Sequence, residues 1–137
     1  MTATSWLRAA SVIAIVQFAA HTAMFVSARP RHGADEIAVV RAMKDHSFLF
    51  VGSRRSYWDF YFGYGLMAAF VCVIQAVLFW QLAGYAAAAP GLVRAVSALF
   101  VVAVLGHAAL ALRFFFITPV IPDLLIAACL ALSIAAG

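Results

Sequence analysis

Four long apolar segments constrain this chain more than any other feature. They cover residues 6–27, 57–83, 93–117 and 122–136. About 20 apolar residues in a helix cross a hydrocarbon core about 30 Å thick, and the fourth segment is barely long enough. A transmembrane barrel would need alternating segments of about 10 residues, which these are not. The sequence therefore predicts an all-α fold, a single integral membrane four-helix bundle spanning residues 1–137.

Composition agrees with this fold. The chain is 67% hydrophobic and 10% charged, against about 45–50% and about 25% in soluble domains. The first apolar segment, which ends in Val26-Ser27-Ala28, also imitates a secretory signal peptide, and its cleavage would leave three spans. Gln17 and His21 inside the segment, and its length, favour a retained span.

The loop at residues 28–56 carries six of the nine basic residues. Because Lys and Arg of short loops prefer the cytoplasm, we expect this loop to be cytoplasmic and both termini to lie outside. The net charge of +4 predicts attraction to anionic lipid headgroups, and no nucleic-acid-binding motif accompanies it. The basic residues are Arg29, Arg31, Arg41, Lys44, Arg54 and Arg55.

Inside this loop, residues 33–46 predict a short helix. Asp35 and Glu36 in its first turn, and Lys44 and His46 in its last, match the helix dipole. Apolar residues at helical spacing beside basic ones are typical of a helix on the headgroups. An ordinary polar connector with some helix is the alternative.

Asp59 stands among aromatic residues at the start of the second span. Ser56 three positions earlier predicts a capping box, and Tyr57, Trp58 and Tyr61 predict an interfacial aromatic belt.

A polar cluster is the sharper hypothesis for Asp59. Antiparallel spans bring Asp59, Arg113, His21 and Asp123 to the same leaflet. An intramembrane arginine is costly unless it pairs, so we expect an Asp59–Arg113 ion pair, with Gly63 leaving room for the neighbouring helix. Such a cluster, with Tyr61 in reach, either fixes helix register or forms a ligand or proton site.

Cofactor and metal signals are weak. His21 and His107 lie inside spans one and three and raise the hypothesis of bis-histidine haem ligation, although buried histidines more often bond to backbone or tyrosine. No spacing typical of a metal site is present. Cys72 and Cys129 are interpreted as packing residues.

The block Ser56-Tyr-Trp-Asp-Phe-Tyr-Phe-Gly63, together with Gln75-Ala-Val-Leu-Phe-Trp-Gln81 and Leu112-Arg-Phe-Phe-Phe116, resembles an uncharacterised family of small bacterial four-span membrane proteins. The layout is also similar to DoxX-like proteins, by analogy of architecture alone. The resemblance implies the bacterial inner membrane and no particular activity.

The sequence thus predicts a membrane protein that binds a lipid or small amphipathic molecule in a polar pocket of one leaflet, or that serves as a complex subunit or homo-oligomer. The alternative is a small membrane enzyme or redox protein that uses Asp59, His21 and Tyr61 for proton transfer.

Overall fold

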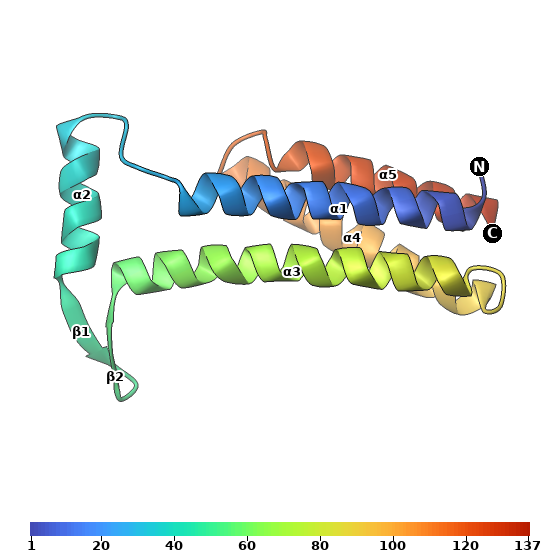
Figure 1. Cartoon of the computed structure of the whole chain (residues 1–137), viewed down its shortest axis with the longest axis horizontal. Helices are drawn as coiled ribbons and strands as arrows, with labels where there is room; N and C mark the ends of the chain where they lie inside the picture. The colour runs from blue at the N-terminus through green and yellow to red at the C-terminus, as the bar shows by residue number, and fades with distance from the viewer. The chain divides into compact units, whose positions relative to one another are not determined.

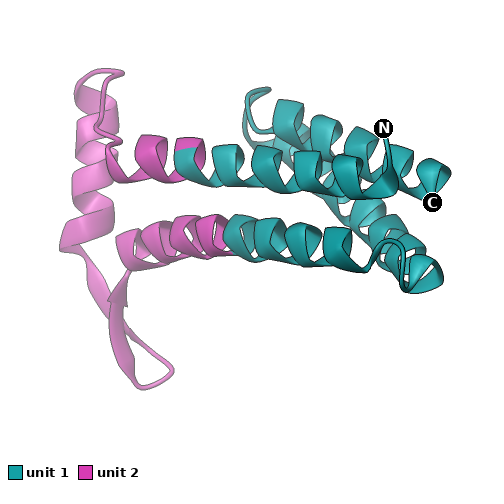
Figure 2. Ribbon diagram, turned by 45° about the vertical axis from the view of Figure 1, so that its right-hand side comes forward, with its two compact units in different colours: residues 1–19, 71–137 teal, residues 20–70 magenta.

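A computed structural model describes all residues, Met1–Gly137, as five helices and one two-stranded hairpin (Figure 1). The chain divides into two compact units, residues 1–19 with 71–137 (unit 1) and residues 20–70 (unit 2), shown in Figure 2. The helices α1 and α3 each contribute residues to both. The elements are α1 (Ala3–Val26), α2 (Ala34–Asp45), β1 (Ser47–Phe50), β2 (Ser53–Ser56), α3 (Tyr57–Tyr85), α4 (Pro90–Phe114) and α5 (Val120–Ala136).

By length and composition, three of these helices, α1, α3 and α4, are long and apolar enough to cross a membrane, which supports the predicted membrane protein. The helix α5 is apolar but has only 17 residues. The third predicted segment was expected to stay helical to residue 117, but α4 ends at Phe114. The helix ends there because the backbone of Phe115 leaves the helical region, with φ of −126° and ψ of −122°.

The main apolar core of unit 1 receives side chains from four helices. Leu7 of α1, Phe79 of α3, and Ile126 and Leu130 of α5 are completely buried, and Val104 of α4 lies in the same cluster. Small residues line the rest of the core, so the helices approach closely, as is common between helices in lipid. The α1 hydroxyl of Ser11 donates to the backbone carbonyl of Ala76 in α3 at 2.7 Å.

Unit 2 has a different construction, and part of it was not predicted. The expected short helix is present as α2, but it is followed by an antiparallel hairpin in which Leu49 pairs with Arg54 and Phe50 with Ser53. The hairpin turns through Val51 and Gly52, both with positive φ. Asn-Gly or Asp-Gly is the usual sequence of such a turn, so Val-Gly gave little signal for it.

Within unit 2, α2 and the hairpin run crosswise to the first turns of α3 (Figures 1 and 2). The Lys44 ammonium group of α2 lies 4.2 Å from the ring centre of Trp58 in α3, a cation–π contact that joins the two helices. The hairpin packs on α3 through Phe48, whose ring is 5.1 Å from that of Tyr57. If α3 spans the bilayer along its axis, α2 and the hairpin lie along the membrane surface.

Candidate functional site

The most developed polar site of unit 1 is a buried carboxylate held by two other helices. Asp123, in the first turn of α5, is only 2% exposed. Its Oδ1 accepts a hydrogen bond of 3.0 Å from Nε2 of Gln17 in α1. Its Oδ2 lies 2.7 Å from Nδ1 of His107 in α4. Three helices thus meet at one acidic side chain, and we call Gln17, His107 and Asp123 the unit 1 polar site.

The geometry assigns hydrogen-bonding roles within this site. If Asp123 is ionised, its carboxylate only accepts hydrogen bonds, and the Nδ1 of His107 is then the donor. The opposite ring nitrogen, Nε2, has no protein partner, and the His107 side chain is 56% exposed. The neutral ring therefore presents an acceptor at Nε2, and the protonated ring presents a donor, fixed in direction by the carboxylate behind it.

This arrangement differs from the predicted cluster. Asp123 was expected in a cluster with Asp59, Arg113 and His21, whereas its hydrogen-bond partners are Gln17 and His107. Arg113 is exposed in the last turn of α4, with its guanidinium carbon 5.2 Å from the centre of the Phe114 ring. Asp59 and Arg113 belong to different units, and their ion pair stays a prediction.

His107 and Asp123 were each singled out in the sequence, but their pairing was not predicted. The short connection between the third and fourth segments makes α4 and α5 an antiparallel hairpin, so residues on either side of that connection face each other. His107 lies about two turns before the end of α4 and Asp123 about one turn into α5, a mismatch of about 6 Å in depth that the side chains span. Gln17 was noted as a polar residue inside the first apolar segment, but it was not connected with this cluster.

Asp59 forms the predicted capping box. Its Oδ2 accepts from the backbone N–H of Ser56 at 2.8 Å and from the Ser56 hydroxyl at 3.1 Å. In return, the Ser56 Oγ accepts from the backbone N–H of Asp59 at 3.2 Å. The pair satisfies backbone donors that a helix start leaves free. This carboxylate is therefore committed to starting α3 at the boundary between loop and apolar helix.

His21 contacts backbone and aromatic neighbours in unit 2. Its Nε2 lies 3.1 Å from the backbone oxygen of Gly65 in α3. Its ring stacks on Phe25 with 5.7 Å between centroids, and Phe25 in turn lies 5.4 Å from Tyr61. The imidazole therefore links α1 to α3, and its Nε2 is engaged. Haem ligation by His21 and His107, and proton transfer by Asp59, His21 and Tyr61, stay predictions.

Close helix contact in unit 2 occurs at Gly65 instead of at Gly63. A Cβ atom at Gly65 would overlap the tip of the Phe25 ring, whereas a Cβ at Gly63 would meet no atom within 4 Å. Gly63 instead forms the floor of a shallow hollow on α3, which is lined by Asp59, Phe60, Gly63, Tyr64 and Met67. The hollow is walled by this one helix, so it does not enclose a substrate.

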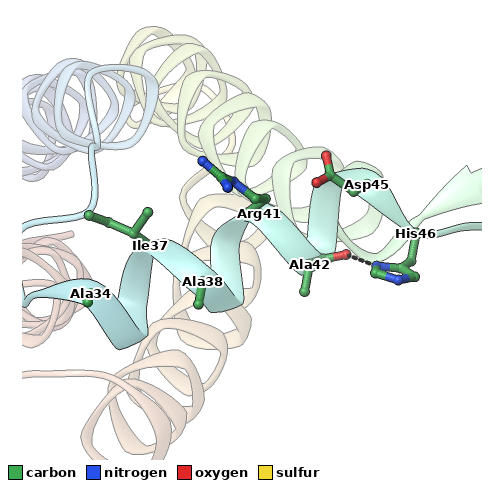
Figure 3. Close-up of a pocket in the computed structure, with 7 residues that line it drawn as sticks. All are labelled: Ala34, Ile37, Ala38, Arg41, Ala42, Asp45 and His46. Carbon is green, nitrogen blue, oxygen red and sulfur yellow. Dashed lines mark hydrogen bonds between the residues drawn. The ribbon is translucent and has the colours of Figure 1, made fainter.

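The other hollow lies on the outer face of α2 (Figure 3). Residues at helical spacing line it, with Ile37 and Arg41 along one side and the His46 ring at its end, where Nδ1 lies 3.0 Å from the carbonyl oxygen of Ala42. It too is the surface of a single helix. The lining residues are Ala34, Ile37, Ala38, Arg41, Ala42, Asp45 and His46.

No group of three or more His, Cys, Asp or Glu side chains is arranged to hold a metal ion. Cys72 and Cys129 are free thiols, and Cys129 packs in the unit 1 core.

Comparison with known proteins finds no relative of this chain. No protein-family model matches it, and no curated protein and no solved structure shows significant similarity to it. The function is therefore inferred from the geometry of the site.

Proposed function

We propose that this chain is a four-span protein of the bacterial inner membrane that binds a small amphipathic or lipid-like molecule at the unit 1 polar site. One observation carries the proposal: a buried carboxylate orients a histidine whose second nitrogen is unpartnered within an apolar helix. The resemblance to small bacterial four-span proteins supports the membrane and the topology, and the six basic residues of the first loop support a cytoplasmic loop.

The chemistry of Nε2 defines the ligand. In hydrocarbon, a polar atom without a partner costs free energy, because no water replaces the missing hydrogen bond. Ala103 and Leu110, one turn to either side of His107, are exposed and apolar. A molecule with one hydroxyl or carbonyl group on an apolar body would satisfy Nε2 and lie along these side chains. This is the chemistry of a small amphipathic ligand.

The Asp123 carboxylate holds His107 in the orientation that ligand binding needs. Hydrogen bonds to charged groups contribute about 1.5–3 kcal/mol, and two of them fix Asp123. Asp123 then fixes the ring orientation and tautomer of His107, as carboxylates do behind metal-ligating histidines. The ligand therefore meets a rigid partner, which reduces the entropy lost on binding.

Native mass spectrometry of protein extracted in mild detergent tests the proposal, with extraction and identification of any retained small molecule. We expect a ligand bound to wild-type protein to be lost from Asp123→Asn and from His107→Gln. Asp35→Asn is the matched control, because it makes the same carboxylate-to-amide change on α2, where Asp35 is exposed and forms no side-chain hydrogen bond.

Thermal unfolding of the same samples separates loss of the site from loss of the fold. Ligand loss from a variant that unfolds like wild type supports the proposal. An apo mass for wild type, or equal retention by all variants, contradicts it. A wild-type mass seen only with another polypeptide would instead identify an accessory subunit of a membrane complex, or a homo-oligomer if that polypeptide is a second copy.

A further inference from the structure

We propose that the tip of the β1–β2 hairpin, residues 49–51, is a membrane-surface anchor that inserts into the headgroup region of an anionic bilayer. The proposal is independent of the ligand site and concerns unit 2 alone. Its occupant is the lipid surface, as four features of the hairpin indicate.

The tip is apolar and exposed. Val51 is 89% exposed and Leu49 is 73% exposed, while Phe50 is about half exposed. The other face of the hairpin is used in folding, because the Phe48 ring stacks on Phe60 of α3 and the Phe50 ring meets Phe60 edge to face. Leu49 and Val51 therefore add nothing to the packing of unit 2. An exposed apolar group that the fold does not use marks an interaction surface.

Valine is an unfavourable residue for the backbone conformation at position 51. Val51 has φ of 47° and Gly52 has φ of 77°, the combination that a two-residue turn with positive φ at both positions requires. A β-branched residue is strained in this region, whereas asparagine adopts it readily. The turn would form more easily with a polar residue at position 51. An apolar side chain kept at this position indicates a role outside the fold.

Connectivity brings the hairpin to the bilayer boundary. The strand β2 ends at Ser56, and α3, which is long and apolar enough to span a membrane, begins at the next residue, Tyr57. The hairpin extends crosswise to the first turns of α3 (Figures 1 and 2). An element that leaves a membrane span crosswise, without an intervening linker, runs along the membrane surface instead of into water.

The positive charge of the hairpin also favours an anionic lipid surface as its partner. Arg54 pairs with Leu49 across the hairpin, and Arg55 pairs with Phe48. The two salt bridges of the chain, His32–Glu36 and His107–Asp123, involve neither arginine. Interfacial segments typically combine apolar groups buried about 5–10 Å below the headgroups with basic groups that contact lipid phosphates. The hairpin has both components within a few residues.

Quenching of a probe beside the tip tests the proposal. The full chain, with Cys72→Ala and Cys129→Ala, carries an environment-sensitive fluorophore at Ser53→Cys and is reconstituted in nanodiscs of phosphatidylcholine and phosphatidylglycerol. We expect iodide to quench this probe about threefold less with the native tip than with Val51→Asn, because the native tip holds the probe near the lipid. Nitroxide-labelled lipid should show the opposite order.

Val51→Asn is a sharp variant because it relieves the turn while removing the apolar side chain, so a loss of protection cannot be attributed to unfolding. Arg54→Gln with Arg55→Gln should reduce protection, and more so in discs that contain phosphatidylglycerol than in phosphatidylcholine alone. Equal iodide quenching of the native and Val51→Asn tips overturns the proposal. Protection that appears only in discs holding two copies of the chain also overturns it, in favour of contact between copies.

Discussion

The two units are held together by different kinds of contact. Unit 1 buries small and aliphatic side chains, and its one aromatic pair is Phe79 with Phe100. Unit 2 has Ala69 as its only buried apolar residue. It has eight contacts between aromatic rings, one of them with a histidine, and five of these join different elements. Six of the nine basic residues also lie in unit 2.

This difference matches two environments of a membrane. Small residues let helices pack closely where lipid tails offer no hydrophobic driving force. Aromatic rings and long basic side chains suit the headgroup region, because they combine an apolar body with a polar end. The polar groups follow the same division. Unit 1 buries one carboxylate with two partners, whereas unit 2 uses Asp59 and Glu36 to start helices.

Removal of a large side chain from unit 1 should have the largest effect. Phe79 is completely buried, and Phe79→Ala should lower the free energy of unfolding in mixed detergent micelles by about 2–3 kcal/mol. This is less than the loss of about 3–5 kcal/mol in a soluble core, because lipid replaces water in the transfer of the side chain and the cavity supplies most of the cost.

Phe70→Ala is the matched control for this change. Phe70 lies on the same helix, in its unit 2 part, and is 65% exposed. Its truncation should change the unfolding free energy by no more than about 0.5 kcal/mol. Equal losses from the two variants would mean that the unit 1 core does not have the close packing described above.

A second comparison concerns two glycines in the unit 2 part of α3. Gly65→Ala should destabilise by about 1–2 kcal/mol, because the new Cβ pushes Phe25 out of its stack with His21. Gly63→Ala should be neutral or stabilising by up to about 1 kcal/mol, because its Cβ meets open space and alanine favours helix. Unfolding titrations of both variants measure this difference in sign.

A double-mutant cycle identifies the cause. Phe25→Ala removes the ring that Gly65→Ala would displace, so the cost of Gly65→Ala should be smaller in the Phe25→Ala background than in wild type. An unchanged cost would show that Gly65 is needed for its own backbone and not for the ring.

The long helices could be predicted from the length of the apolar segments, and α2 could be predicted from the charges at its two ends. The start of α3 could also be predicted, because Ser56 and Asp59 have the spacing of a capping box and form one. The hairpin could not, because a Val-Gly turn lacks the usual signal and its strands are only four residues long. The end of α4 at Phe114 was not predicted, because the apolar segment continues through residues 115–117.

The unit 1 polar site could be predicted in part from the sequence. Asp123 and His107 were singled out as intramembrane polar residues, which are functional hypotheses by default. Their pairing depends on which faces of α4 and α5 meet, and a segment that is apolar on all sides leaves that face undefined. Charge suggested an arginine partner for the acid, whereas the structure uses an amide and an imidazole.

The smallest predicted effect concerns the start of α2 in unit 2. Backbone hydrogen bonds from His32 above all, and from Arg31, hold the pKa of Glu36 below its usual value of 4.5. Because the folded loop favours the ionised form, its stabilisation is complete at neutral pH and is lost as the pH falls below that value. The amide proton shifts of Arg31 and His32, followed by NMR, should therefore titrate with a midpoint below 4.5. Glu36→Gln should abolish this titration while Asp35→Asn preserves it, and shifts that stay constant in acid would show that Glu36 does not hold the loop in the membrane-bound protein.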